Sequence, residues 1–286
     1  MYTAKLYQSD AGYLVLTDFT SEYHVTDITG LGPSGAHINM TNYARTDGAI
    51  LNSKKLNPKT ITITLLLEGD VEAARQQIYG YFRTKEAARF YFANGSRDAY
   101  IDGWVQSVEV DLFSMSEQMI LTLFCPDPYF QADEEITASL RFQPKRFYFP
   151  FAIDQDDPVE FSVYDPENRV TVENNSDTPT GFEASVLFYG ACSSIVIRNL
   201  TTQEFIGVNH AFQAWDLLTI TTKEKQKKVT VKRNSVTTSL MADLEDGSTF
   251  PVIAPGDNEF NYSVDGGDAD DNAEVVITYN RRYRGL

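Results

Sequence analysis

The sequence contains few of the residues on which disulfide and metal chemistry depend. Its 286 residues include two cysteines, Cys125 and Cys192, and three histidines. Two cysteines so far apart exclude a disulfide framework or a cysteine-rich metal site. His24, His37 and His210 are scattered, without the spacing of a metal site or a neighbouring cysteine. We therefore expect no metal and no cofactor.

Positive charge is also scarce. The chain has 24 lysines and arginines against 40 aspartates and glutamates, a formal net charge of −16. Nucleic acids and anionic membranes are bound through basic surfaces, so we expect neither sequence-specific nucleic-acid binding nor membrane insertion. The charge remains compatible with proximity to DNA. An acidic wall repels phosphates, so a duplex could slide past it without binding. The one basic cluster, Lys223–Lys228, is expected at a solvated hairpin end, with an anion or partner contact as the alternative.

Long apolar runs are missing as well. No stretch approaches the roughly 18 residues of a membrane span. The N-terminus lacks the basic region and apolar run of a secretory signal, so we expect a soluble protein made in a cytoplasm. A hydrophobic content of 42% and an aromatic content of 13% predict a folded chain. Its length allows two domains, each with its own core.

The clearest pattern lies between Thr60 and Phe130. Thr60–Leu65 alternates polar and apolar residues, which predicts a half-buried strand. Asp70 is placed to cap a helix over residues 70–83, where apolar residues recur three or four apart. Asn94-Gly95 then predicts a hairpin turn between two further strands. The segment indicates a rigid, sheet-based building block.

Two prolines separate this region from the second half. Pro126 and Pro128 predict a strand end, since proline donates no ladder hydrogen bond. After a join over residues 131–150, short β-like runs alternate with turn signals, which favours an antiparallel sandwich. The runs are Glu183–Phe188, Ser194–Arg198, Leu217–Thr221, Lys228–Lys232 and Glu274–Tyr279. The predicted fold is mainly β with one helix in the N-terminal half: an α+β sheet or barrel domain over residues 1–130, then an all-β sandwich over residues 131–286.

Two motif matches lack the context that their chemistry requires. Gly30–Gly35 fits the GxGxxG pattern, but no helical stripe follows it, so a plain loop is favoured over a dinucleotide site. Asp268, Asp270 and Asn272 imitate the start of a calcium loop, without the glycine and glutamate that such a loop needs later. A solvated acidic hairpin is favoured there.

The two tryptophans lead to different expectations. Trp104 lies in an apolar strand and is expected in the core. Trp215 and Asp216, just before a predicted strand, are the candidate site residues for a glycan or partner contact, because sugar rings stack on exposed aromatics beside acidic groups. Core or interface packing of Trp215 is the alternative. No nucleophile–base pair or paired carboxylate is recognisable, so we expect no catalytic residue and no enzyme.

The order of motifs in the first half resembles a known family. A glycine-rich loop precedes a strand–helix–strand region that ends in a proline-rich stop. Together these resemble the N-terminal domain of distal tail proteins from long-tailed phages. The motifs are Gly30-Leu31-Gly32-Pro33, Arg45-Thr46-Asp47-Gly48, Asn94-Gly95-Ser96-Arg97, Tyr100-Ile101-Asp102-Gly103 and Cys125-Pro126-Asp127-Pro128-Tyr129.

The second half resembles the C-terminal domain of the same family, so the resemblance spans nearly the whole chain. It rests on Phe147-Tyr148-Phe149-Pro150, Asn175-Ser176-Asp177-Thr178-Pro179-Thr180, Pro255-Gly256-Asp257-Asn258 with Tyr262, and the closing stretch Val275–Tyr283. Ser176 replaces the family's usual glycine. Ala214-Trp215-Asp216 stands where the family often has Gly-Asp, which makes Trp215 worth testing.

The resemblance implies a structural virion protein at the phage tail tip. The first domain would form a ring, usually a hexamer, around a channel for DNA. Our own hypothesis is that the 30–58 loops and the 70–83 helix make the ring contacts. The second would be a galectin-like sandwich. Implied partners are other copies of the chain, the tail tube protein, the tail tip or tail-associated protein, and the receptor-binding protein. The alternative is a carbohydrate-binding module that contacts host wall glycans through the sandwich.

Overall fold

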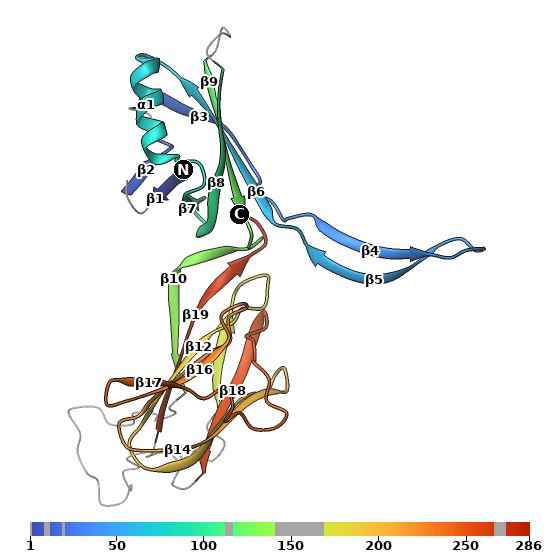
Figure 1. The fold of residues 1–286 in the computed structure, drawn as a ribbon, viewed down its shortest axis with the longest axis vertical. Coiled ribbons are helices and arrows are strands. Elements are labelled where there is room, and N and C mark those ends of the chain that lie inside the picture. Colours follow the sequence, from blue (N-terminus) through green and yellow to red (C-terminus); the bar gives the residue numbers. More distant parts are fainter. Residues whose placement is uncertain (1, 9–11, 19–20, 112–116, 141–168, 266–272) are drawn as a thin grey trace, which may run out of the picture. The chain divides into compact units, whose positions relative to one another are not determined.

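The computed structural model describes residues 2–8, 12–18, 21–111, 117–140, 169–265 and 273–286 (Figure 1). The chain forms two compact units, Met1–Asp133 with Arg282–Leu286, and Glu134–Arg281. The described residues are mostly strands with a single helix, which confirms the predicted fold class. The functional division at residues 130 and 131 stays a prediction, because compactness does not show which parts act separately.

The first unit is built on one antiparallel sheet. Its strands follow the path β3-β6-β9-β8-β7-β1-β2, and the start of β10 also pairs with β8. The bounds are β1 (Thr3–Gln8), β2 (Gly12–Val15), β3 (Tyr23–Thr29), β6 (Lys59–Leu67), β7 (Ala87–Ala93), β8 (Asp98–Asp111), β9 (Gln118–Cys125) and β10 (Phe130–Ser139). Pro126 and Pro128 end β9 as expected, but the chain re-enters the sheet at Phe130, which is fully buried.

Alternation along the strands creates the core of this unit. Ile61, Ile63 and Leu65 of β6 are fully buried, while the threonines between them point to the opposite face. The helix α1 (Val71–Tyr81) covers the apolar side through Ala74 and Ile78. Its expected cap is present, since the amide of Ala73 donates a hydrogen bond of 3.1 Å to Asp70 Oδ1.

The prediction for Trp104 is wrong. Its side chain is 48% exposed. Neighbouring residues in a strand point to opposite faces, and in β8 the inward positions belong to Ile101 and Val105. Trp104 therefore lies on the outer face, opposite Ala87 of β7 and Phe124 of β9.

Residues 36–56 form a hairpin where the sequence analysis expected loops. β4 (Ala36–Asn42) and β5 (Ala49–Leu56) pair only with each other, as a separate two-stranded sheet. Every residue of both strands is exposed. The hairpin leaves the first unit between β3 and β6 and extends away from the sheet (Figure 1). We call it the arm.

The second unit contains two antiparallel sheets. One has the order β17-β16-β15-β12-β19, and the other β11-β18-β13-β14. The bounds are β11 (Val170–Asn174), β12 (Glu183–Phe188), β13 (Cys192–Asn199), β14 (Glu204–Phe212), β15 (Leu217–Thr221), β16 (Lys228–Arg233), β17 (Val236–Ser239), β18 (Gly256–Asp265) and β19 (Ala273–Tyr283). All five predicted runs are strands, and Phe182, Phe188 and Phe260 are fully buried in this unit's core.

Some expectations fall outside the described residues. These are the calcium-like residues Asp268, Asp270 and Asn272, the Phe147–Pro150 segment, and the join beyond residue 140. Within the described ranges no helix is long and apolar enough to cross a membrane.

Gly30, which joins β3 to the arm, is expected to resist substitution. Its φ is +89°, and a Cβ there would lie 2.1 Å from the carbonyl oxygen of Thr60. Gly30→Ala should lower the free energy of unfolding by about 2 kcal/mol or more, from backbone strain and the clash. Gly32→Ala is the matched control, since Gly32 has an ordinary φ and open space around it. Thermal unfolding of both variants measures the difference, and equal stability of the two would contradict this account.

Candidate assembly interface

The arm is amphipathic, although all of it is exposed. Paired residues of an antiparallel ladder share one face, so the register assigns each side chain. Ile38 pairs with Lys54, and Met40 pairs with Leu51. A bulge between these pairs adds one extra residue to β5. Without this bulge, Leu51 would lie on the face opposite to Met40.

The two faces of the arm differ in polarity. The apolar face carries Ala36, Ile38, Met40, Ala49, Leu51 and Leu56, together with Lys54 and Asn42. The polar face carries His37, Asn39, Thr41, Ser53 and Lys55, with Ile50 as its one large apolar residue. The four large side chains of the apolar face are between 37% and 58% exposed. Contiguous apolar surface of this kind marks a contact with another molecule.

The base of the arm is fixed by a buried cation. Lys59 is 3% exposed, and its Nζ donates hydrogen bonds to the carbonyl oxygens of Gly32 (2.5 Å) and Arg284 (3.1 Å). The ammonium also lies 4.6 Å from the ring centre of Phe130. Burial lowers the pKa of Lys59 from its usual value. The amide of Leu286 bonds the carbonyl of Leu31 at 3.0 Å, so the C-terminal residues hold this loop from a second side.

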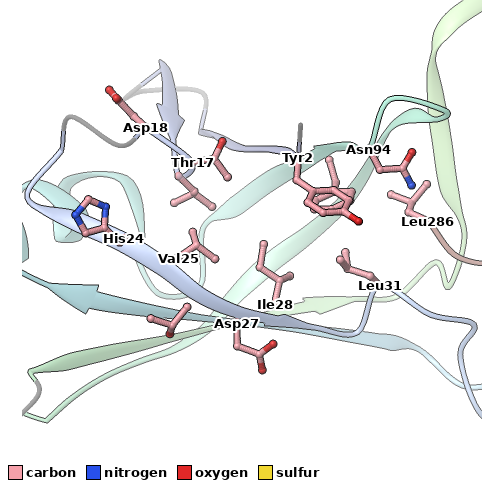
Figure 2. Close-up of a pocket in the computed structure, with 13 residues that line it drawn as sticks. Tyr2, Thr17, Asp18, His24, Val25, Asp27, Ile28, Leu31, Asn94 and Leu286 are labelled. Atoms are coloured by element: carbon pink, nitrogen blue, oxygen red, sulfur yellow. The ribbon is translucent and has the colours of Figure 1, made fainter.

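A groove of about 780 Å³ opens beside the arm base (Figure 2). Its apolar lining residues are Leu16, Val25, Ile28, Leu31, Phe92 and Leu286. Five consecutive residues of β3, His24–Ile28, border it. Among the described strands β3 pairs only with β6, so the groove runs along an unpaired strand edge. Figure 2 shows Val25, Ile28 and Leu31 on the groove side of the ribbon, with Asp27 pointing the other way.

The part of the outer face over β3, β6, β9 and β8 carries mainly hydroxyl and acidic groups in three rows. The register places Thr29, Thr62, Thr122 and Ser107 in one row across β3, β6, β9 and β8. The next rows contain Asp27, Thr64, Ile120 and Glu109, then His24, Leu66, Gln118 and Asp111. No lysine or arginine occurs in these three rows of described residues. Such a surface repels phosphates and presents no cation to hold them.

Trp215 is displayed from a tight turn in the second unit. Its side chain is 73% exposed, and its φ of +71° is unusual for a bulky residue. The Trp215 amide donates to the carbonyl of Phe188 at 2.7 Å. The ring of Tyr189 meets the indole edge-on, with 6.0 Å between centroids. The sequence analysis missed Tyr189, which no local pattern connects with Trp215.

Asp216 lies inside the same turn and is 1% exposed. Arg233 binds its carboxylate through two nitrogens, at 2.8 Å and 2.5 Å, and the Gln213 amide donates to it at 2.8 Å. These bonds, the one from Arg233 first, hold the pKa of Asp216 below its usual value. The two candidate site residues therefore differ: Trp215 faces solvent, and Asp216 stabilises the turn that presents it.

Reactive or metal-binding groups do not gather elsewhere in the described ranges. No cluster of three or more His, Cys, Asp or Glu side chains occurs there. Burial raises the pKa of the Cys125 thiol to about 12, and that of Cys192 is raised for the same reason. His210 Nδ1 lies 2.9 Å from Asp243 Oδ2.

Two family models match the chain. The model described as "Siphovirus-type tail component, C-terminal domain" matches residues 175–283. The model described as "Phage tail protein RIFT-related domain" matches residues 14–125. Between them they cover both units. No curated protein matches the chain significantly.

A solved structure shares the fold. The Dit protein of phage SPP1, described as a paradigm of the hub adsorption apparatus in phages that infect Gram-positive hosts, matches with a TM-score of 0.68 and 12% identity, over 99% of each chain. A chain of the phage P2 baseplate in its calcium-activated conformation matches with a TM-score of 0.49 and 10% identity, over 100% of each chain. The first likeness shows the fold across both units.

Asp216→Asn should weaken the turn under Trp215. The variant keeps the shape but loses the ion pair, so we expect the free energy of unfolding at about pH 7 to fall by about 1–3 kcal/mol. The pKa of Asp216 in the folded protein is lower than its unfolded value of 3.8. The stability that the ion pair contributes is therefore fully present above pH 3.8 and is lost as the pH falls through the folded pKa. Denaturant titrations at neutral and acidic pH measure it. Exposed Asp257→Asn is the control, and a difference from wild type that persists in strong acid would contradict the assignment.

Proposed function

The chain belongs to the distal tail protein family of siphoviruses, and we propose that it forms a ring, with six copies, that joins the tail tube to the tail tip. It is a structural, Dit-like hub protein of the phage tail and baseplate. The observation that carries the ring proposal is the arm, whose apolar face no described residue of its own chain covers.

The arm favours a cyclic assembly over a symmetric dimer. We propose that it contacts a different surface on the next copy, not a second arm. A head-to-tail contact of this kind generates a ring if its rotation closes, and a filament if it does not. A ring also covers the unpaired edge of β3, because every copy then has a neighbour. The helix α1 remains a second proposed ring contact.

The hydroxyl and acidic face of the sheet supports a channel wall. DNA crosses a passage quickly only if the wall does not bind its phosphates. The three rows across β3, β6, β9 and β8 contain Asp27, Glu109 and Asp111 but no lysine or arginine. Facing inward in a ring, they would line the passage with groups that repel phosphate.

We assign the remaining surfaces by the same proposal. One rim of the ring would bind the tail tube protein and the other the tail tip or tail-associated protein, while the second unit would hold the receptor-binding protein. The protein would act in the virion after synthesis in the host cytoplasm. Its role would be mechanical, with no catalytic step.

Removing the arm should abolish the ring and leave the subunit folded. The amide of Asn57 bonds the carbonyl of Gly35 at 2.8 Å, so a short Gly-Ser turn can replace residues 36–56 without straining the base. Mass photometry of the purified protein should show closed particles for the wild type and monomers for the shortened chain. Circular dichroism confirms that the variant is folded. A wild-type protein that stays monomeric, and that also fails to join tube or tip proteins, would falsify the proposal.

A second candidate function is a glycan contact through the second unit. The observation that favours it is Trp215, which is held exposed in a left-handed conformation beside Tyr189. An exposed indole and a perpendicular phenol ring offer two walls to a sugar ring. Buried Asp216 is excluded from direct contact. Glu274 accepts a hydrogen bond from Tyr189 Oη at 2.7 Å and is the acidic group proposed beside the rings.

Titration with host wall polysaccharide tests this candidate. We expect saturable binding that Trp215→Ala weakens roughly three- to tenfold, the effect of losing one aromatic contact. Trp104→Ala is the matched control, because Trp104 is also exposed but lies in the first unit. The absence of binding at millimolar sugar, or equal effects of the two substitutions, removes the glycan contact.

A further inference from the structure

The rings of Trp215 and Tyr189 form a right-angled corner on the surface of the second unit. Their planes meet at 89°, with 6.0 Å between the centroids, so each ring supplies one wall. The Trp215 side chain is 73% exposed and that of Tyr189 is 37% exposed, so both walls remain accessible to a ligand. The corner joins two chain segments, since Tyr189 directly follows β12 and Trp215 precedes β15, the neighbouring strand.

The backbone conformation of Trp215 is unfavourable for a bulky residue. Its φ of +71° lies in the left-handed region, which glycine adopts without cost. The turn imposes this conformation, because the Trp215 amide is bonded to Phe188 and the next residue, Asp216, is bound by Arg233. Backbone strain of this kind collects at ligand-binding sites. The position of the indole therefore indicates a contact with another molecule rather than a role in folding.

A carboxylate lies beside the two rings. Glu274 Oε2 accepts the 2.7 Å hydrogen bond from Tyr189 Oη, and the register places Glu274 opposite Leu187 of β12. The faces of aromatic rings carry partial negative charge, and they attract a cation that lies within about 6 Å of the ring centre. A carboxylate adds a full negative charge to this attraction. Two ring faces and a carboxylate together select a cation over a neutral group.

The basic residues near the corner leave this preference in place. Arg233 binds the Asp216 carboxylate through two nitrogens, so the pair adds no net charge. Lys232 lies in the same cross-strand row as Glu274, at the other end of the four strands β19, β12, β15 and β16. Three strand spacings separate the two backbones by about 14 Å. The Glu274 side of the corner is therefore the negative side.

We infer that the corner of Trp215, Tyr189 and Glu274 binds an organic ammonium group carried by a glycan. This rests on the proposed glycan contact of the second unit and names the chemical group that the contact recognises. The ammonium lies against the ring faces, with Glu274 as its counter-ion. Two sources share this chemistry, namely the protonated amine of an amino sugar and a quaternary ammonium substituent.

Paired probes test the charge of the ligand. The variant Trp104→Phe leaves Trp215 as the only tryptophan, so its fluorescence reports on the corner. Choline and 3,3-dimethylbutan-1-ol have the same shape, but only choline is charged. We expect saturable quenching by choline, with an affinity at least about fivefold higher than that of the alcohol. Equal affinities, or no binding of any ammonium probe at tens of millimolar, overturn the inference.

A second pair of probes distinguishes the two sources. Glucosamine is cationic in mildly acidic buffer, whereas N-acetylglucosamine is neutral. Preferential binding of glucosamine assigns the amine of an amino sugar, and preferential binding of choline assigns a quaternary ammonium substituent. Each cation is compared with its own neutral partner, so the shape of the ligand is controlled in both cases.

Two substitutions with opposite expected effects test the counter-ion. Glu274→Gln keeps an oxygen that can accept the Tyr189 hydrogen bond but removes the charge, and it should weaken choline binding roughly three- to tenfold. Lys232→Gln removes the opposing cation and should strengthen choline binding about twofold. Neither should alter binding of the neutral alcohol. A Glu274→Gln variant that binds choline as well as its parent contradicts the assignment of the counter-ion.

Trp215→Gly separates binding from folding. Glycine adopts the φ of this position freely, so the melting temperature should stay the same or rise, while choline binding, measured by calorimetry, should be lost. Undiminished choline binding by this variant overturns the inference. Wall polysaccharide that binds through Trp215 while no ammonium probe binds overturns the cation but leaves the glycan contact intact. Choline binding without polysaccharide binding removes the glycan contact and leaves the ammonium site.

Discussion

A two-stranded ribbon has no second layer with which to cover its own apolar face, and the arm between β3 and β6 is such a ribbon. Ile38, Met40 and Leu51 are about half exposed although they share one face. In a single copy this arrangement loses the free energy that burial of these side chains would supply. The rest of the first unit is consistent with a subunit completed by its neighbours. Among the described strands β3 pairs only with β6, and the groove beside its other edge is apolar.

An arm is useful for assembly only if its direction is fixed, and its base supplies that rigidity. Gly30 lets the chain turn close against Thr60, where any side chain would clash. Lys59 ties the carbonyls of Gly32 and Arg284 together inside the unit, and the Leu286 amide holds Leu31. A buried lysine is costly unless its donors are used, and here two carbonyls and the Phe130 ring satisfy it. Loop, strand and C-terminal residues thus converge on one point at the root of the arm.

The sequence predicted the elements whose periodicity is regular. The alternation in Thr60–Leu65, the Asp70 cap and the five short runs of the second half all correspond to observed strands or to α1. The arm was missed because its bulge interrupts the alternation: Leu51 and Leu56 are five residues apart, and they share a face only because the extra residue shifts the register. Trp104 was misplaced because an apolar strand does not reveal which of its faces is inward. The groove joins residues from opposite ends of the chain, Leu16 and Leu286, which no local pattern connects.

The two proposed contacts differ in how much structure supports them. Trp215 is a single exposed ring on a turn that Asp216 and Arg233 make rigid. These two residues explain why the ring is exposed, but they do not indicate what it binds. The arm has an apolar face set by register and a single cation on that face, and the same chain has an apolar groove beside β3. A receptor contact through Trp215 is a property of a single copy, whereas the arm has a role only when copies meet. Assembly is for this reason the function that we propose for the first unit.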